Sequence, residues 1–133
     1  MTDGMSIADE AEAVLAALGS RFRLAIVTNG PAALQRSKVE RFGLEARVHW
    51  VVISGEVGSE KPDRAIFDHA RQLAGADAAR TAHVGDSLTT DVAGANAAGV
   101  LSIWLRSPLV RARPEDAGLS PDVTIGHIRE LLD

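Results

Sequence analysis

The chain contains no cysteine among its 133 residues. This absence excludes a disulfide framework, a thiol nucleophile and a thiolate metal site. Long hydrophobic runs are also missing, since no apolar stretch approaches the roughly 20 residues that a helix needs to cross a bilayer. Residues 1–18 are acidic and amphipathic, which is unlike a secretory leader with a basic start and an apolar centre. We therefore expect a cytoplasmic protein that does not enter a membrane.

Positive charge is in short supply as well. Lysine and arginine number 14 against 18 acidic residues, which gives a formal net charge of −4. Nucleic-acid binding requires a positive face that releases counterions from phosphates. The densest basic group is Arg106, Arg111 and Arg113, and the prolines around it indicate a solvated loop. We therefore expect no nucleic-acid partner.

What the chain does contain favours one globular domain over residues 1–133. Hydrophobic residues make up 46% of the sequence and charged residues 24%, which is enough apolar material for a core. Apolar runs predict strands at 22–27, 49–53, 81–84, 100–105 and 123–125. Helical patterns between and around them lie at 7–18, 31–42, 62–73, 90–98 and the C-terminal end. This alternation predicts an α/β fold, a three-layer Rossmann-like core with a mainly parallel sheet.

Polar residues follow three of the predicted strands. Thr28 and Asn29 come after the first strand, Ser54 after the second and Asp86 after the third. Ligands of open α/β sheets bind beyond the carboxyl ends of the strands. These residues therefore predict one shared site.

Asp86 and Asp91 bracket a predicted strand-to-helix turn. Two carboxylates on a short turn suit Mg²⁺, a hard cation that usually takes one or two protein carboxylates and keeps several waters. In the alternative reading, Asp91 only favours the positive end of a helix dipole and Asp86 only makes a turn. His83 lies beside them, and because Mg²⁺ prefers oxygen we expect it to be a core or supporting residue.

Two further features suit an anion. The Thr28 hydroxyl and the backbone amides of Asn29 and Gly30 precede a predicted helix N-terminus, which favours negative ligands. Lys61 stands just before another helix start, where the helix dipole disfavours a cation. It is either an exposed lysine or a positive charge kept for a function, and we favour the function.

Three segments resemble the motifs of the haloacid dehalogenase-like hydrolase superfamily, within its group of small-molecule phosphatases. They are IVTNGPAALQRSKVERFGL at 26–44, VISGEVGSEKPDRAIFDHA at 52–70 and GDSLTTDVAGANAAG at 85–99. The resemblance implies that Thr28 binds a phosphoryl oxygen, that Lys61 steadies negative charge, and that Asp86 and Asp91 hold Mg²⁺. It also implies hydrolysis of a small phosphorylated metabolite, because metal-independent dehalogenases depart from this pattern of acids.

One family motif has no counterpart. The family places Asp-x-Asp at the end of a first strand, where the leading Asp attacks phosphorus. The acidic stretch 9–12 follows no predicted strand, so we do not regard it as a substitute. The resemblance begins near Ser6, where family chains return from a helical cap domain. We therefore expect an N-terminally truncated core without cap or nucleophile, inactive by itself; the alternative is a non-catalytic binding or assembly module.

The missing family strand is central, between those that correspond to 22–27 and 81–84. Its absence would leave unpaired backbone groups on both neighbours. The two neighbours could close up and pair, or a second copy could lend a strand in a homodimer. In the third possibility, the isolated piece is only marginally stable.

Overall fold

The computed structural model describes residues 7–106 and 118–132. Ser6, Arg111 and Arg113 lie outside these residues. The strands are β1 (Ala25–Thr28), β2 (Trp50–Ile53), β3 (Ala82–Gly85), β4 (Leu101–Leu105) and β5 (Val123–Ile125). The α-helices are α1 (Ile7–Gly19), α2 (Ala32–Arg41), α3 (Ser54–Val57), α4 (Arg64–Ala74) and α5 (Ala93–Ala98). Shorter helical turns are η1 (Leu44–Ala46), η2 (Ala78–Arg80), η3 (Leu88–Val92) and η5 (Ile128–Leu132).

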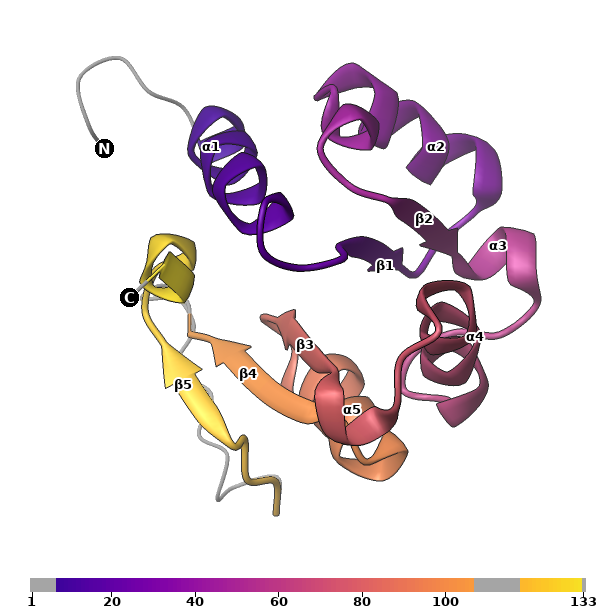
Figure 1. The fold of residues 1–133 in the computed structure, drawn as a ribbon. Coiled ribbons are helices and arrows are strands. Elements are labelled where there is room, and N and C mark those ends of the chain that lie inside the picture. The colour runs from indigo at the N-terminus through magenta and orange to yellow at the C-terminus, as the bar shows by residue number, and fades with distance from the viewer. Residues whose placement is uncertain (1–6, 107–117, 133) are drawn as a thin grey trace.

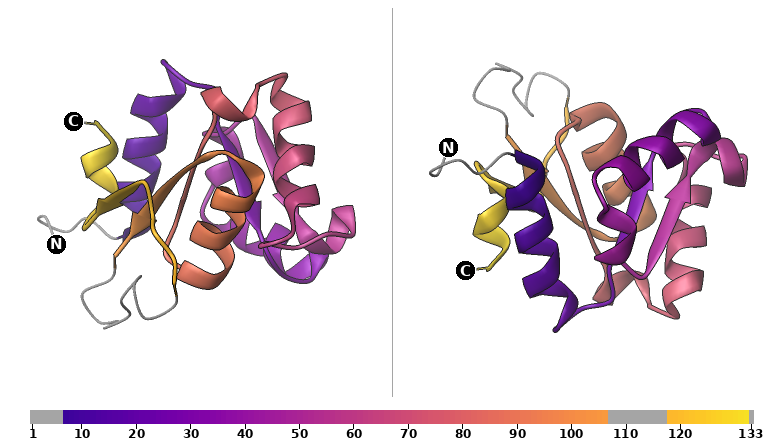
Figure 2. Two further views of the ribbon diagram at one scale, coloured as in Figure 1. Left: turned by 90° about the horizontal axis from the view of Figure 1, so that it is seen from below. Right: turned by 90° about the horizontal axis from the view of Figure 1, so that it is seen from above.

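The predicted alternation of strands and helices is confirmed, and the chain has an α/β fold with helices on both sides of its strands (Figure 2). Some boundaries differ from the prediction. The first strand begins at Ala25 because the Leu24 amide donates to Nδ1 of His49 (3.0 Å) instead of entering the ladder. Helix α3 follows β2 directly, in a segment between 53 and 62 where neither a strand nor a helix is predicted. The predicted C-terminal helix is a 3₁₀ turn, η5, and packs against α1.

The strands form two parallel sheets rather than one. β1 pairs with β2, and β3, β4 and β5 form the second sheet in that order (Figure 1). Within the described residues, β1 and β3 belong to different sheets and do not pair. The first possibility raised by the sequence, direct pairing of these two strands, is therefore wrong for this structure.

Burial reflects this interruption. Val52 and Ile53 of β2 are 1% and 0% exposed. In contrast, Ile26 and Val27 of β1 are only partly buried, although they belong to an equally apolar strand. Parallel strands are normally covered on both faces. Both strands of this sheet have one unpaired edge among the described residues, and the more exposed one, β1, is the strand nearer the second sheet (Figure 1).

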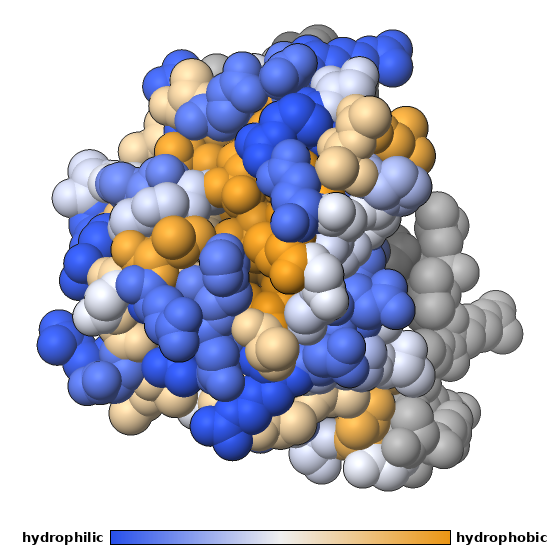
Figure 3. All heavy atoms as spheres, turned by 90° about the vertical axis from the view of Figure 1, so that its right-hand side faces the viewer, coloured by the Kyte–Doolittle hydropathy of each residue, from blue (hydrophilic) through white to orange (hydrophobic). Residues whose placement is uncertain are grey.

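The main core lies where α4 and α5 meet the strands. Its buried members are Val52, Ile66, Phe67, Ala95, Ala98 and Val100. Helix α4 contacts β1 and β2, and it also contacts α5, which packs on β4, so the two helices together join the sheets. Apolar side chains also remain outside this core, and Figure 3 shows hydrophobic residues that reach the surface between hydrophilic ones. No helix in the described ranges is long and apolar enough to cross a membrane.

Gly94 allows the close contact between α5 and α4. A Cβ at this position would lie 2.5 Å from Cε2 of Phe67 and 3.1 Å from Cα of Pro62. Neither neighbour is the flexible end of a side chain, because one is a packed ring and the other is backbone. Residue 94 must therefore be glycine if α5 is to keep its distance from α4.

We expect Gly94→Ala to lower the free energy of unfolding by about 2 kcal/mol, because an extra methyl group in a packed core forces shifts. Denaturant unfolding measures the change. Gly19→Ala is the matched control, since a Cβ there would meet its nearest atom, Cδ1 of Leu24, at an ordinary 3.7 Å. Equal stabilities of Gly94→Ala and wild type would contradict the packing argument.

Candidate functional site

The predicted meeting of the strand ends is confirmed for β1 and β2. Oγ of Ser54 accepts a hydrogen bond from the Gly30 amide (2.8 Å), and the Gly55 amide donates to the Gly30 carbonyl (3.1 Å). Gly55 has to be glycine, because a Cβ there would lie 2.7 Å from the Ala32 nitrogen. The Gly30 amide, which the sequence places in an anion seat, is therefore already paired with Ser54.

Asn29 holds the loop that carries Lys61. Its Nδ2 donates to the Lys61 carbonyl (2.9 Å), and its Oδ1 accepts from the Lys61 amide (2.8 Å). Both polar ends of one amide side chain are thus used on one residue, 32 positions along the chain. This two-point contact fixes the lysine backbone at the carboxyl end of β1.

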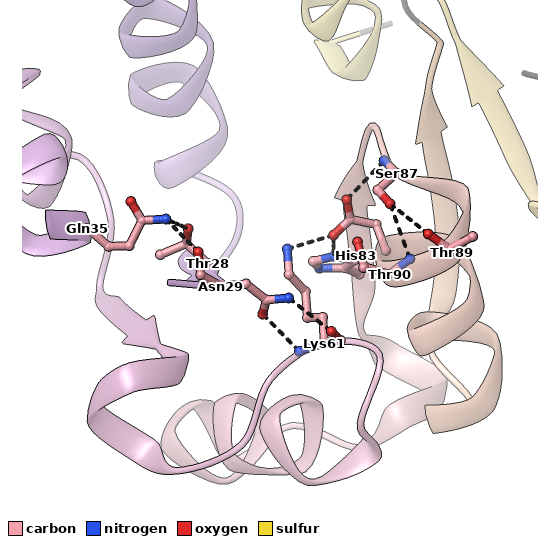
Figure 4. Close-up of polar contacts among 9 residues, drawn as sticks. Thr28, Asn29, Gln35, Lys61, His83, Ser87, Thr89 and Thr90 are labelled. Atoms are coloured by element: carbon pink, nitrogen blue, oxygen red, sulfur yellow. Dashed lines mark hydrogen bonds and ion pairs between the residues drawn. The ribbon is translucent and has the colours of Figure 1, made fainter. Parts of the chain in front are cut away.

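Lys61 then reaches the other sheet. Its Nζ lies 2.7 Å from Oδ1 of Asp91, and the two side chains are only 12% and 7% exposed. Nε2 of His83 lies 2.8 Å from the same oxygen, and the Ser87 amide donates to Oδ2 (3.1 Å). Figure 4 draws these contacts together with those of Asn29. A buried carboxylate with three donors therefore stands at the centre of the site.

These donors set the charge state of Asp91. Burial by itself would raise the pKa of the Asp91 carboxyl, but the hydrogen bond from His83 and the hydrogen bond and charge of Lys61 outweigh it. The Ser87 amide acts in the same direction. The pKa of Asp91 therefore lies well below its ordinary value, and the group is a carboxylate over the physiological range.

Gly85 makes room for this carboxylate. A Cβ on Gly85 would overlap Cγ and Oδ2 of Asp91. The residue that ends β3 must therefore be glycine, because the Asp91 side chain occupies the place of a Cβ. The sequence motif predicts this glycine but does not reveal its reason.

Asp86 differs from Asp91 in almost every respect. Its side chain is exposed, and in the part of the chain that the structure describes its carboxylate has no hydrogen bond or ion pair. Only its backbone is fixed, because its carbonyl accepts from Nε1 of the buried Trp104 (3.1 Å). The two acids predicted as one pair are thus one free carboxylate and one carboxylate that already accepts three hydrogen bonds.

The carboxylates of Asp86 and Asp91 suit a hard cation that takes only a few of its ligands from the protein. The described residues contain no group of three or more His, Cys, Asp or Glu side chains that could hold a metal ion. Mg²⁺ is commonly held by one or two carboxylates and several waters. Asp86 offers such a carboxylate, and Asp91 lies close in the chain with both of its oxygens already accepting hydrogen bonds.

Sequence reasoning missed one residue of the site, Gln35. Its Nε2 donates to Oγ1 of Thr28 (2.9 Å) and to the Asn29 carbonyl (2.6 Å), as Figure 4 shows. The available signal was its place in the first turns of the helix that follows Pro31. His83 lies as expected, in a supporting position, with its ring edge-on to Phe67 (4.9 Å between centroids).

Comparisons with known proteins show the family of the chain. A family model described as haloacid dehalogenase-like hydrolase matches residues 2–99, which is more than half of the chain. The phosphoserine phosphatase of Thermus thermophilus is 44% identical over 124 residues, covering 92% of this chain and 49% of that protein. The pyrimidine 5'-nucleotidase YjjG of Escherichia coli is 37% identical over 122 residues, covering 91% and 53%.

A solved structure of similar fold is the HAD-hydrolase YfnB of Bacillus subtilis bound to magnesium. The TM-score is 0.83 at 29% sequence identity, over 92% of this chain and 53% of that one. The chain thus spans about half the length of the curated relatives it matches.

We expect Asp91→Asn to lower the free energy of unfolding by about 3 kcal/mol near neutral pH, because it leaves the buried Lys61 unbalanced. The lowered pKa of Asp91 supplies stability above about pH 4, the ordinary aspartate value, and this stability is lost as the pH falls further. Denaturant unfolding of both proteins should therefore give stabilities that converge below about pH 4. The exposed Asp77→Asn serves as the control, and a constant gap across the series would contradict the role of the pair.

Proposed function

This chain belongs to the haloacid dehalogenase-like hydrolase family, and we propose that it is the core of a Mg²⁺-dependent phosphatase that acts on small phosphate monoesters. The observation that carries the proposal is the buried ion pair between Lys61 and Asp91 at the strand ends that also present Thr28 and Asp86. The phosphatase and nucleotidase names of its relatives support the same class of substrate. We also propose that the protein is located in the cytoplasm.

Each side chain has a role that its surroundings support. We propose that the Thr28 hydroxyl, the backbone amide of Asn29 and the Lys61 ammonium bind the phosphoryl oxygens. Gly30, whose φ of 144° suits glycine, shapes the turn, and its amide is already bonded to Ser54. Phosphoryl transfer depends mostly on positioning and charge stabilisation, which is what these groups provide.

We propose that Asp86, with Asp91 beside it, holds Mg²⁺. When bound, the ion would supply positive charge next to the phosphoryl oxygens. The free carboxylate of Asp86 supports this assignment, and so does the magnesium in the related YfnB structure. Because Asp91 already accepts three hydrogen bonds, Asp86 is the principal ligand of the two.

We also propose that this chain alone does not turn over phosphate esters. The resemblance assigns the attack on phosphorus to an aspartate of a motif that the sequence does not contain. Hydrolysis of p-nitrophenyl phosphate with Mg²⁺ tests this point, and we expect no turnover. Turnover that Asp86→Ala abolishes would contradict it. The alternative, a non-catalytic binding or assembly module, predicts no turnover even when the chain is extended with a first strand that ends in Asp-x-Asp. Turnover by such an extended chain is therefore the discriminating measurement.

We expect Asp86→Ala to weaken Mg²⁺ binding at least tenfold, roughly the least that loss of a ligand costs. Calorimetric titration with MgCl₂ measures the affinity. Asp77→Ala carries the same change in charge at an exposed position outside the site and should bind as wild type does. Equal affinities of the three proteins would contradict the assignment of Asp86.

The open edges of β1 and β3 support a proposal about assembly. At their amino ends, Arg23 donates to the carbonyl of Ala74, where α4 ends on the way to β3 (2.5 Å). At their carboxyl ends, Lys61 links Asn29 to Asp91. The two strands therefore run in the same direction. One added parallel strand could pair with both edges, and we propose that a second copy of the chain lends it.

Light scattering over a concentration series tests this assembly, and we expect twice the mass of one chain at high concentration. Ala25→Lys should weaken the dimer, because a charged side chain on an edge strand opposes pairing. Ala97→Lys places the same charge on an exposed position of α5 and should leave the dimer intact. A monomer at every concentration would contradict strand exchange.

A further inference from the structure

We propose that Gln35 is a positioning residue that sets the direction of the Thr28 hydroxyl, so that this hydroxyl donates to an anionic oxygen. The inference rests on the proposed function, because it assumes that Thr28 binds a phosphoryl group. It adds a residue to which neither the sequence motifs nor the family resemblance assigns a role.

The contact is short and partly buried. Nε2 of Gln35 lies 2.9 Å from Oγ1 of Thr28 and 2.6 Å from the Asn29 carbonyl oxygen. Gln35 comes from α2 and reaches back over Gly30 to the end of β1. A Cβ on Gly30 would lie 2.8 Å from Cγ of Gln35, so the side chain takes this path because residue 30 is glycine.

The Asn29 carbonyl fixes which end of the amide faces the strand. A carbonyl oxygen only accepts hydrogen bonds, so the group 2.6 Å away has to be a donor. With the amide reversed, two acceptor oxygens would face each other at that distance. Gln35 therefore presents its NH₂ group, and not its oxygen, to Thr28.

The polarity of the Thr28 hydroxyl follows. A hydroxyl has one donor hydrogen and two acceptor lone pairs, and Gln35 uses one of the lone pairs. The hydrogen is thereby kept for another partner. Phosphoryl oxygens accept hydrogen bonds, and their charge makes such bonds shorter and stronger. A residue that accepted from Thr28 at this place would instead take the hydrogen away from the ligand.

Stability accounts for only part of this glutamine, namely the hydrogen bond from its Nε2 to the Asn29 carbonyl. Oε1 of Gln35 is buried without a hydrogen-bond partner among the described residues. A buried polar atom without a partner destabilises the fold. Methionine has a similar length and would fill the same space without that atom. The favourable part of the side chain is the NH₂ group that faces the site.

A double-mutant cycle on the full 133-residue chain tests the proposal, with inorganic phosphate in the presence of Mg²⁺ as the probe. We expect Gln35→Met to lower phosphate affinity about tenfold in the wild-type background, as for a hydrogen bond to a charged group. In the Thr28→Val background, where no hydroxyl remains to be directed, the same change should have little effect. Gln72→Met on the exposed side of α4 is the matched control and should bind phosphate as wild type does.

Equal losses in the two backgrounds would overturn the proposal, because they would show that Gln35 only shapes the turn. Circular dichroism confirms that each variant is folded, and Gln35→Asn, whose shorter amide cannot span both contacts, replaces Gln35→Met if that variant unfolds. Failure of the wild-type chain to bind phosphate would overturn the proposed function itself. Phosphate binding that is insensitive to Gln35 would overturn only this inference.

Discussion

The buried ion pair between Lys61 and Asp91 is the constraint on which the rest of the site depends. It joins a loop held at the end of β1 to a turn that follows β3, although these strands belong to different sheets. A buried charge that loses its partner is strongly destabilising, so separating the two side chains would greatly lower the stability of the fold. The Asn29 contacts, the Ser87 amide and the absence of a Cβ on Gly85 all serve this one placement. Packing of α4 on β1 and β2, and of α5 on β4, supplies the apolar part of the same connection.

The pair also separates two acids that look equivalent in the sequence. Asp91 takes up hydrogen bonds from three groups and keeps its negative charge through them. That charge balances Lys61 and so permits a lysine in a largely buried position. Asp86, five residues earlier, keeps an exposed carboxylate on a backbone fixed by Trp104. One acid therefore stabilises the architecture while the other remains available to a ligand, and the motif needs both for different physical reasons.

Much of this arrangement could be predicted from the order of residues. The alternation of apolar runs and helical patterns placed Thr28, Ser54 and Asp86 at strand ends, and strand ends of parallel sheets meet at one edge. The missing motif made an interrupted sheet possible, but it equally allowed direct pairing of the two flanking strands, which the described residues do not show. The contacts that could not be predicted depend on where side chains from different elements point in the folded chain. In the sequence, Gln35 is an ordinary helical residue, and only the structure shows that its side chain passes over Gly30 to Thr28. The hydrogen bond between the Gly30 amide and Ser54 depends on the register of two strands.

The interruption of the sheet and the proposed lack of a nucleophile in the site have the same structural origin. The edges that face the interruption belong to β1 and β3, and residues of the site stand at the carboxyl ends of these same strands. A parallel strand that paired with both edges would end between Thr28 on one side and Asp86 on the other. Its last residues would therefore enter the site at the moment its backbone closed the sheet. Because the hydrogen bonds of such a strand would stabilise the fold, sheet completion and delivery of a reactive group to Lys61 would be coupled. The half-buried state of Ile26 and Val27 is the part of that coupling visible in the chain alone.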